Sequence, residues 1–196
     1  MTSDSRRGSA GAPRQRESTI ASRRIYDGRV LSLDVDQVRF PDGSMGELEL
    51  IRHAGAAAVI PFLDDPNEPN ARILLLRQFR YAADRYLYEI PAGRLESSEL
   101  PIECARRELL EEAGCTAETL MPLGGFFTTP GFIDEYIHVF LATGLTCGEA
   151  SPERDEFIHR ESHTSQDALR MIDRGEIVDG KTIIALFMAD RLIRQR

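Results

Sequence analysis

The sequence predicts an α+β fold in which a mixed sheet lies between helices and follows a small antiparallel sheet. Three observations predict this fold. Short apolar runs typical of buried strands lie on both sides of one amphipathic helical segment, residues 101–113. Two more helical segments come later, one after Thr164 and one from Lys181 to Arg194. Before residue 53, apolar and polar residues alternate with the period of a strand.

The composition indicates a single domain. The chain has 196 residues, of which 42% are hydrophobic and 29% charged, which fits one domain of ordinary size or one domain with a small addition. No apolar run approaches the ~18 residues of a membrane-spanning helix, and the polar, arginine-rich N-terminus has no apolar stretch of a secretory signal. We therefore expect a cytoplasmic protein with no membrane partner. Cys104, Cys115 and Cys147 show no CxxC spacing, so we expect free thiols in a reducing compartment.

The net charge of −8 is unevenly distributed. Residues 1–24 carry six arginines against two acids, so the remainder of the chain is strongly acidic. An acidic body argues against nucleic acid as a main partner. Residues 1–19 are rich in Ser, Gly, Arg and Pro, and this composition predicts a disordered basic tail.

Residues 20–53 are expected to form the small antiparallel sheet. Leu31, Leu33 and Val35 alternate with polar residues, as in a half-buried strand. A Pro-Asp-Gly turn at 41–43 follows, and the chain returns as a strand over 47–52. We expect residues 54–196 to form the main domain.

The main domain contains apolar runs that predict strands near 54–62, 72–79, 86–90, 124–128, 136–142 and 157–161. The central helix is predicted over 101–113, because Pro101 suits a first helical turn and Gly114 a left-handed cap. Its inner stripe is expected to comprise Ile102, Ala105 and Leu109. Thr164 with Asp167 predicts the start of the next helix.

The segment 93–115, GRLESSELPIECARRELLEEAGC, contains the acids on which the functional interpretation depends. Residues four apart share a helical face, so Glu108 and Glu112 stack with Glu111 beside them. Like charges packed in this way repel one another. A bound hard cation, which prefers oxygen ligands, explains the cluster better than a solvated charge-rich helix does.

This segment resembles the Nudix box: a glycine, five residues, a glutamate, seven residues, then R-E-U-x-E-E-x-G-U, where U is an aliphatic residue. Every position matches except the last, where Cys115 replaces the aliphatic residue. The resemblance extends over about residues 20–190. It implies an α/β/α sandwich and hydrolysis of a diphosphate linkage with Mg²⁺ or Mn²⁺ as cofactor.

The same resemblance implies roles for the residues of the box. Glu108 and Glu112 are the expected central metal ligands, Glu111 shares an ion, and all three are counted as catalytic. The carbonyl of Ala92 is expected to complete a site. The remaining positions of the motif are expected to be structural: Gly93, Glu99, Arg107 and Gly114.

The catalytic base is expected outside the box. In Nudix enzymes that cleave ADP-ribose, a glutamate on a loop takes this role. The acidic loop 148–156 offers Glu156 as the best match and Glu153 as the next. A solvated acidic loop is the alternative.

The substrate class is inferred from Pro130, fifteen residues past the box, because a proline near this spacing marks Nudix hydrolases of ADP-ribose and related nucleoside-diphosphosugars. The resemblance implies hydrolysis of ADP-ribose to AMP and ribose 5-phosphate by a homodimer whose N-terminal sheets meet. A UDP- or GDP-sugar is the alternative substrate, and a non-catalytic ADP-ribose sensor or an mRNA-decapping or nucleotide-cleanup enzyme is less favoured. The candidate substrate-binding residues are Arg52, Arg80, Tyr26, Gly131 and Glu135.

Overall fold

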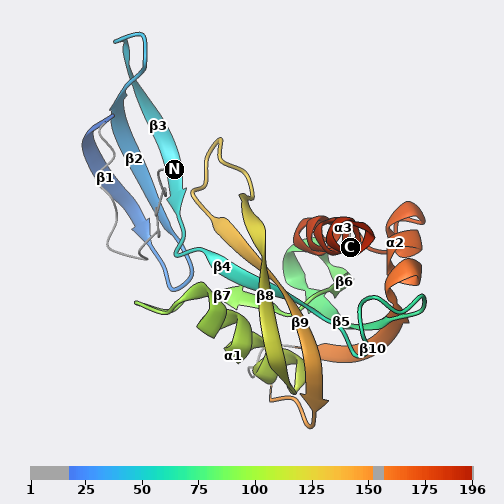
Figure 1. Ribbon diagram of the computed structural model, residues 1–196. Coiled ribbons are helices and arrows are strands. Elements are labelled where there is room, and N and C mark those ends of the chain that lie inside the picture. The colour runs from blue at the N-terminus through green and yellow to red at the C-terminus, as the bar shows by residue number, and fades with distance from the viewer. Residues whose placement is uncertain (1–17, 152–156, 196) are drawn as a thin grey trace, which may run out of the picture.

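The computed structural model describes residues 18–151 and 157–195. It confirms the predicted α+β class, with one small N-terminal sheet and a body of strands between helices (Figure 1). The predicted tail, except its last two residues, lies outside the described part of the chain. Within the described ranges, no helix is both long and apolar enough to cross a membrane.

The N-terminal sheet is an antiparallel meander that extends away from the body (Figure 1). It consists of β1 (Thr19–Asp27), β2 (Ser32–Arg39) and β3 (Met45–Arg52). It contacts the body at the end of β3, where the N–H of Ile51 donates to the Phe132 carbonyl at 2.8 Å and the N–H of Asp134 donates to the Ile51 carbonyl at 3.2 Å. Arg94 of the body also donates to the Arg29 carbonyl in the turn between β1 and β2, at 2.5 Å.

The alternation that predicts β2 does not identify its most buried side chains. Asp34 and Asp36 are 6% and 0% exposed, whereas Leu31 is 36% exposed. The two aspartates are buried because Arg52 forms ion pairs with both of them, and a buried charge must be paired. The ladder register places Leu50, which is buried, opposite Asp34, and Leu48, which is 38% exposed, opposite Asp36.

The body contains two sheets. The larger has the order β7-β4-β9-β8 and is mixed, because β4 (Ala56–Pro61) runs parallel to β9 (Tyr136–Cys147) while β7 (Ala92–Arg94) and β8 (Cys115–Phe127) are antiparallel to their neighbours. The smaller is antiparallel, with the order β10-β5-β6, and comprises β10 (Ile158–Thr164), β5 (Arg72–Arg80) and β6 (Arg85–Glu89). A short 3₁₀ turn, η1 (Tyr81–Ala83), joins β5 to β6.

Helices cover both sides of these strands (Figure 1). α1 (Pro101–Ala113) packs on Ala57 and Val59 of β4, while α2 (Ser165–Asp173) and α3 (Gly180–Arg194) share a core with Ala58 and Ile60 on the other face. β4 is therefore buried on both faces, which explains why it reads as a continuous apolar run.

The boundaries of α1 agree with the prediction, and Gly114 caps it with a φ of 64°. Two details of the prediction are wrong. Ile102 is 38% exposed, and Cys104 instead packs inward beside Ala105 and Leu109. The following strand begins at Cys115, nine residues before the predicted start at Gly124, because Ala117, Glu118 and Pro122 are residue types depleted in strands.

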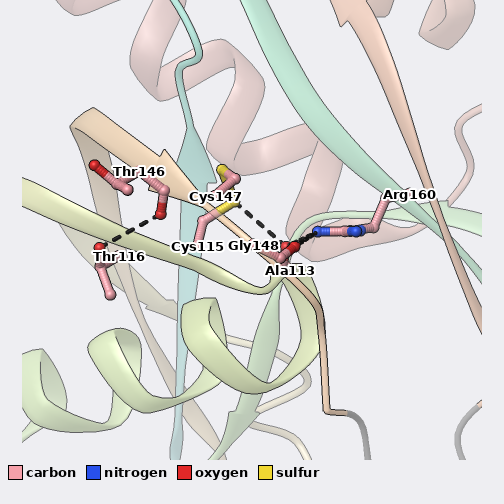
Figure 2. The surroundings of a disulfide bond; sticks show 7 residues. All are labelled: Ala113, Cys115, Thr116, Thr146, Cys147, Gly148 and Arg160. Atoms are coloured by element: carbon pink, nitrogen blue, oxygen red, sulfur yellow. Dashed lines mark hydrogen bonds between the residues drawn. A yellow bond between two sulfur atoms is a disulfide. The ribbon is translucent and has the colours of Figure 1, made fainter.

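The expectation of three free thiols is also wrong. Cys115 and Cys147 form a disulfide, with their Cα atoms 4.0 Å apart (Figure 2). The two residues are direct partners in the antiparallel β8–β9 ladder, a pairing that brings side chains on one face close together. Among the described residues, Cys104 is the remaining thiol, and it is buried.

Candidate active site

Two carboxylates of α1 lie against the backbone of β7. Glu112 Oε2 accepts a hydrogen bond from the Ala92 N–H at 2.8 Å. The Glu108 carboxylate lies so close to Gly93 that a Cβ added there would be 1.9 Å from Oε1. Both glutamates are largely buried, at 8% and 3% exposed for Glu108 and Glu112. The backbone of residues 92 and 93 is thus a cradle for the two acids.

Arg107 links the other acids of the box. Its Nε and Nη2 donate to the two oxygens of Glu99 at 2.9 and 3.0 Å. Its Nη1 donates to Glu108 at 2.5 Å and to Glu111 at 3.1 Å. The hydrogen bond from Arg107 is the main reason that the pKa of Glu99 lies below its usual value, and the same bonds raise the pKa of Arg107. Glu99 therefore contacts an arginine rather than the cradle.

The donor set fits a hard divalent cation. Glu108 and Glu112 present carboxylate oxygens beside a glycine that leaves room for them. Within residues 18–151 and 157–195, no three acidic, histidine or cysteine side chains converge into a ready-made cation site. Mg²⁺ commonly uses only one or two carboxylates and takes its other ligands from water and substrate phosphates. The pair at the cradle is consistent with that kind of site.

A cavity of about 450 Å³ opens beside this cradle. Ala92 and Gly93 form part of its wall. Three cations, one histidine and two acids also line it: Arg80, Arg94, Lys181, His53, Glu135 and Asp179. The cavity therefore combines positive charge for an anion with acceptors for hydroxyl groups.

Of the predicted substrate contacts, Arg80 and Glu135 line this cavity. Arg52, Tyr26 and Gly131 are not among the described residues that line it. Arg52 instead forms ion pairs with Asp34, Asp36 and Asp134 at the joint between the N-terminal sheet and the body. Tyr26 is 59% exposed.

The predicted bases, Glu153 and Glu156, lie outside the described residues. Residues just before them, 148–151, are hydrogen-bonded to the C-terminal end of α1. Gly148 donates its N–H to the Gly114 carbonyl at 2.8 Å, and Ser151 donates its N–H to the Glu111 carbonyl at 2.9 Å. Arg160 donates to the carbonyls of Ala113 and Gly148 at 2.7 and 2.8 Å (Figure 2).

Comparison with known proteins identifies the family. The model of the NUDIX domain matches residues 52–186. The chain belongs to the Nudix family.

Proteins similar to this Nudix chain carry different names. An ADP-ribose pyrophosphatase of Bacillus subtilis is 41% identical over 87% of this chain and 90% of its own length. A methanol dehydrogenase activator of Bacillus methanolicus is 40% identical over the same shares. A solved structure described as an ADP compounds hydrolase matches with a TM-score of 0.76 at 17% identity, covering 91% of this chain and 94% of that one, which supports the fold.

The prediction from sequence missed part of this Nudix pocket. His53, Arg94, Asp179 and Lys181 line the cavity but belong to no motif. One signal was present for Lys181, because it is the single lysine in a chain with 23 arginines.

Proposed function

We propose that this Nudix hydrolase cleaves the diphosphate of ADP-ribose, with Mg²⁺ or Mn²⁺, to give AMP and ribose 5-phosphate. The observation that carries the proposal is the 41% identity to an ADP-ribose pyrophosphatase over 90% of that protein's length. The cationic cavity beside the acids of the box supports it. A UDP- or GDP-sugar remains the alternative substrate.

In this proposal the cradle holds the cation. Glu108 and Glu112 provide oxygen ligands, the Ala92 carbonyl completes a site, and Glu111 joins when its contact with Arg107 opens. The bound cation would neutralise the diphosphate and lower the pKa of an attacking water. Arg107 restrains the rotamers of Glu99, Glu108 and Glu111, as partners of metal ligands commonly do.

The chain's own groups orient the substrate. Arg80 would bind the diphosphate, because a guanidinium matches phosphate oxygens in geometry and charge. Glu135, which also lines the cavity, would accept hydrogen bonds from sugar hydroxyls. Glu156, or else Glu153, would take the proton from water, and the bonds that fasten residues 148–151 to α1 support a role for this loop near the site.

The N-terminal sheet is proposed to pair with that of a second copy. It exposes many apolar side chains in the single chain: Ile20, Ile25, Tyr26, Val30, Leu31, Phe40, Met45 and Leu48. A cluster of exposed apolar residues on one small sheet typically marks an interface. Arg52, Tyr26 and Gly131, which do not line the cavity described above, would then meet the substrate only in the dimer. Light scattering that gives the mass of a monomer at micromolar protein concentration would overturn the proposed dimer.

A substrate panel tests the proposed function. ADP-ribose, UDP-glucose, GDP-mannose and a capped dinucleotide are incubated with purified protein and Mg²⁺, and kcat/KM is compared. We expect ADP-ribose to rank first and activity to disappear with a chelator. A value for ADP-ribose tenfold below that of another sugar nucleotide would favour the alternative.

A further inference from the structure

A buried acid lies behind the cationic wall of the cavity. Glu89, at the end of β6, is 1% exposed. Arg80 binds it with two parallel hydrogen bonds, from Nε at 2.8 Å and from Nη2 at 2.7 Å. Lys181 Nζ also forms an ion pair with Glu89, at Oε2, and another with Asp179 Oδ2 at 3.1 Å. One carboxylate therefore holds two of the cations that line the cavity.

Lys181 reaches Glu89 from a firmly placed helix end. Asp179 caps α3 by accepting from the Thr182 N–H at 3.0 Å. The hydroxyl of Thr182 accepts from the N–H of Ile90 at 3.0 Å. The first turn of α3 is thus attached to the residue after β6 by a hydrogen bond to the Thr182 hydroxyl, which does not involve the lysine side chain.

The charges in this group compete. Arg80 has five N–H donors, and the paired geometry assigns two of them to Glu89. An anionic substrate must attract the same guanidinium that Glu89 already attracts. A second cation on Glu89 offsets part of its charge and so reduces this competition. Burial by itself disfavours the charged carboxylate, but Arg80 and Lys181 together hold the pKa of Glu89 below its usual value.

The residue type is also informative. The chain contains one lysine and 23 arginines, and that lysine lies between two carboxylates with only 13% of its side chain exposed. An ammonium is a compact charge with three donors, whereas a guanidinium is broad and planar. A narrow position between Glu89 and Asp179 suits the compact group.

We propose that Lys181 is a positioning residue: by pairing with Glu89 it leaves Arg80 oriented and available for the diphosphate of the substrate. The inference rests on the proposed function in so far as this cavity receives a nucleoside diphosphate group. Lys181 acts through Glu89 and does not need to touch the substrate.

A double-mutant cycle tests it, with the wild type, Lys181→Met, Glu89→Gln and the variant carrying both changes. For each protein, KM and kcat with ADP-ribose and Mg²⁺, the Kd of ADP by calorimetry, and Tm are measured. We expect Lys181→Met to raise both KM and the Kd of ADP about tenfold, the equivalent of about 1.4 kcal/mol, with a much smaller change in kcat. In the Glu89→Gln background, the same substitution should change them less than about twofold, because no competing carboxylate charge remains.

Two results would overturn the proposal. Equal effects of Lys181→Met in both backgrounds would mean that Lys181 binds the substrate directly. A lowered Tm with KM and the Kd of ADP unchanged would mean that the lysine only stabilises the fold. The ADP titration separates this test from that of the proposed function: if the wild type does not hydrolyse ADP-ribose, the cycle in Kd still decides the role of Lys181.

Discussion

The carboxylate of Glu108 occupies the space that a side chain on residue 93 would need. A Cβ built on Gly93 would lie 1.9 Å from Glu108 Oε1 and 2.1 Å from Cδ. The glycine of the box is therefore required by the acid that follows it fifteen residues later. The contact is with the end of a flexible side chain, so a substitution would move Glu108 more than it would disturb the fold.

Gly93→Ala is expected to lower kcat about tenfold or more while costing only about 1 kcal/mol of stability, the low end for overpacking. Steady-state kinetics with Mg²⁺ and urea unfolding measure the two effects. Gly148→Ala is the matched control, because a Cβ there meets nothing within 4 Å. Wild-type kcat in Gly93→Ala would show that the position of Glu108 is unimportant.

Glu112→Gln is expected to reduce kcat about 10²–10³-fold, comparable to the loss of one strong electrostatic contact in a transition state. The amide oxygen can still accept from the Ala92 N–H, so Tm should stay near the wild-type value. The control is Glu103→Gln on the exposed first turn of the same helix, which should keep full activity. If Mg²⁺ stimulated the hydrolysis rate of Glu112→Gln as much as that of the wild type, Glu112 would not be a ligand of the cation.

Removal of the disulfide should lower stability. The bond joins residues 32 apart, and a loop of that size corresponds to about 3–4 kcal/mol in the chain-entropy description. Urea unfolding of Cys115→Ser/Cys147→Ser against the wild type measures the loss, and Cys104→Ala controls for removal of a thiol. Three titratable thiols in denatured, unreduced wild type would show that the bond does not form.

Arg52→Met should destabilise the protein by about 3 kcal/mol or more, because it leaves Asp36, which is fully buried, without its cation. Adding Asp36→Asn should recover much of that loss, since the uncompensated charge is removed. Denaturant unfolding of both variants gives the comparison, with exposed Arg39→Met as control. Equal stability of the single and double variants would show that Arg52 does not act on Asp36.

The Glu99–Arg107 pair predicts a dependence of stability on pH. The folded pKa of Glu99 lies below its ordinary value of 4.5, chiefly because of the hydrogen bond from Arg107. The contribution of Glu99 to the free energy of unfolding is therefore complete when the pH is above that ordinary value, and it is lost as the pH falls through the folded pKa. The stability difference between wild type and Glu99→Gln should be larger near about pH 6 than near about pH 3. An unchanged difference would mean that the carboxylate charge contributes nothing.

The box and its helix were predictable because their information is local. Residues 108 and 112 lie on one face of a helix whatever the rest of the fold. Gly114 ends the helix because glycine readily adopts a left-handed backbone conformation. Apolar runs likewise located the buried strands β4 and β5. The same spacing places Glu108 and Glu112 together against the backbone of residues 92 and 93, and their role as metal ligands stays a prediction.

The remaining features depend on contacts between distant residues. The sequence by itself determined which acids share a face of α1, since four residues make about one helical turn. Only the tertiary structure decided that Lys181 pairs with Glu89, 92 residues away, that Cys115 meets Cys147, and that Arg52 is occupied by Asp34 and Asp36. These pairs become neighbours only when strands align in register and helices pack on the sheets. Neither process produces a repeat or a fixed spacing that could be recognised in the sequence.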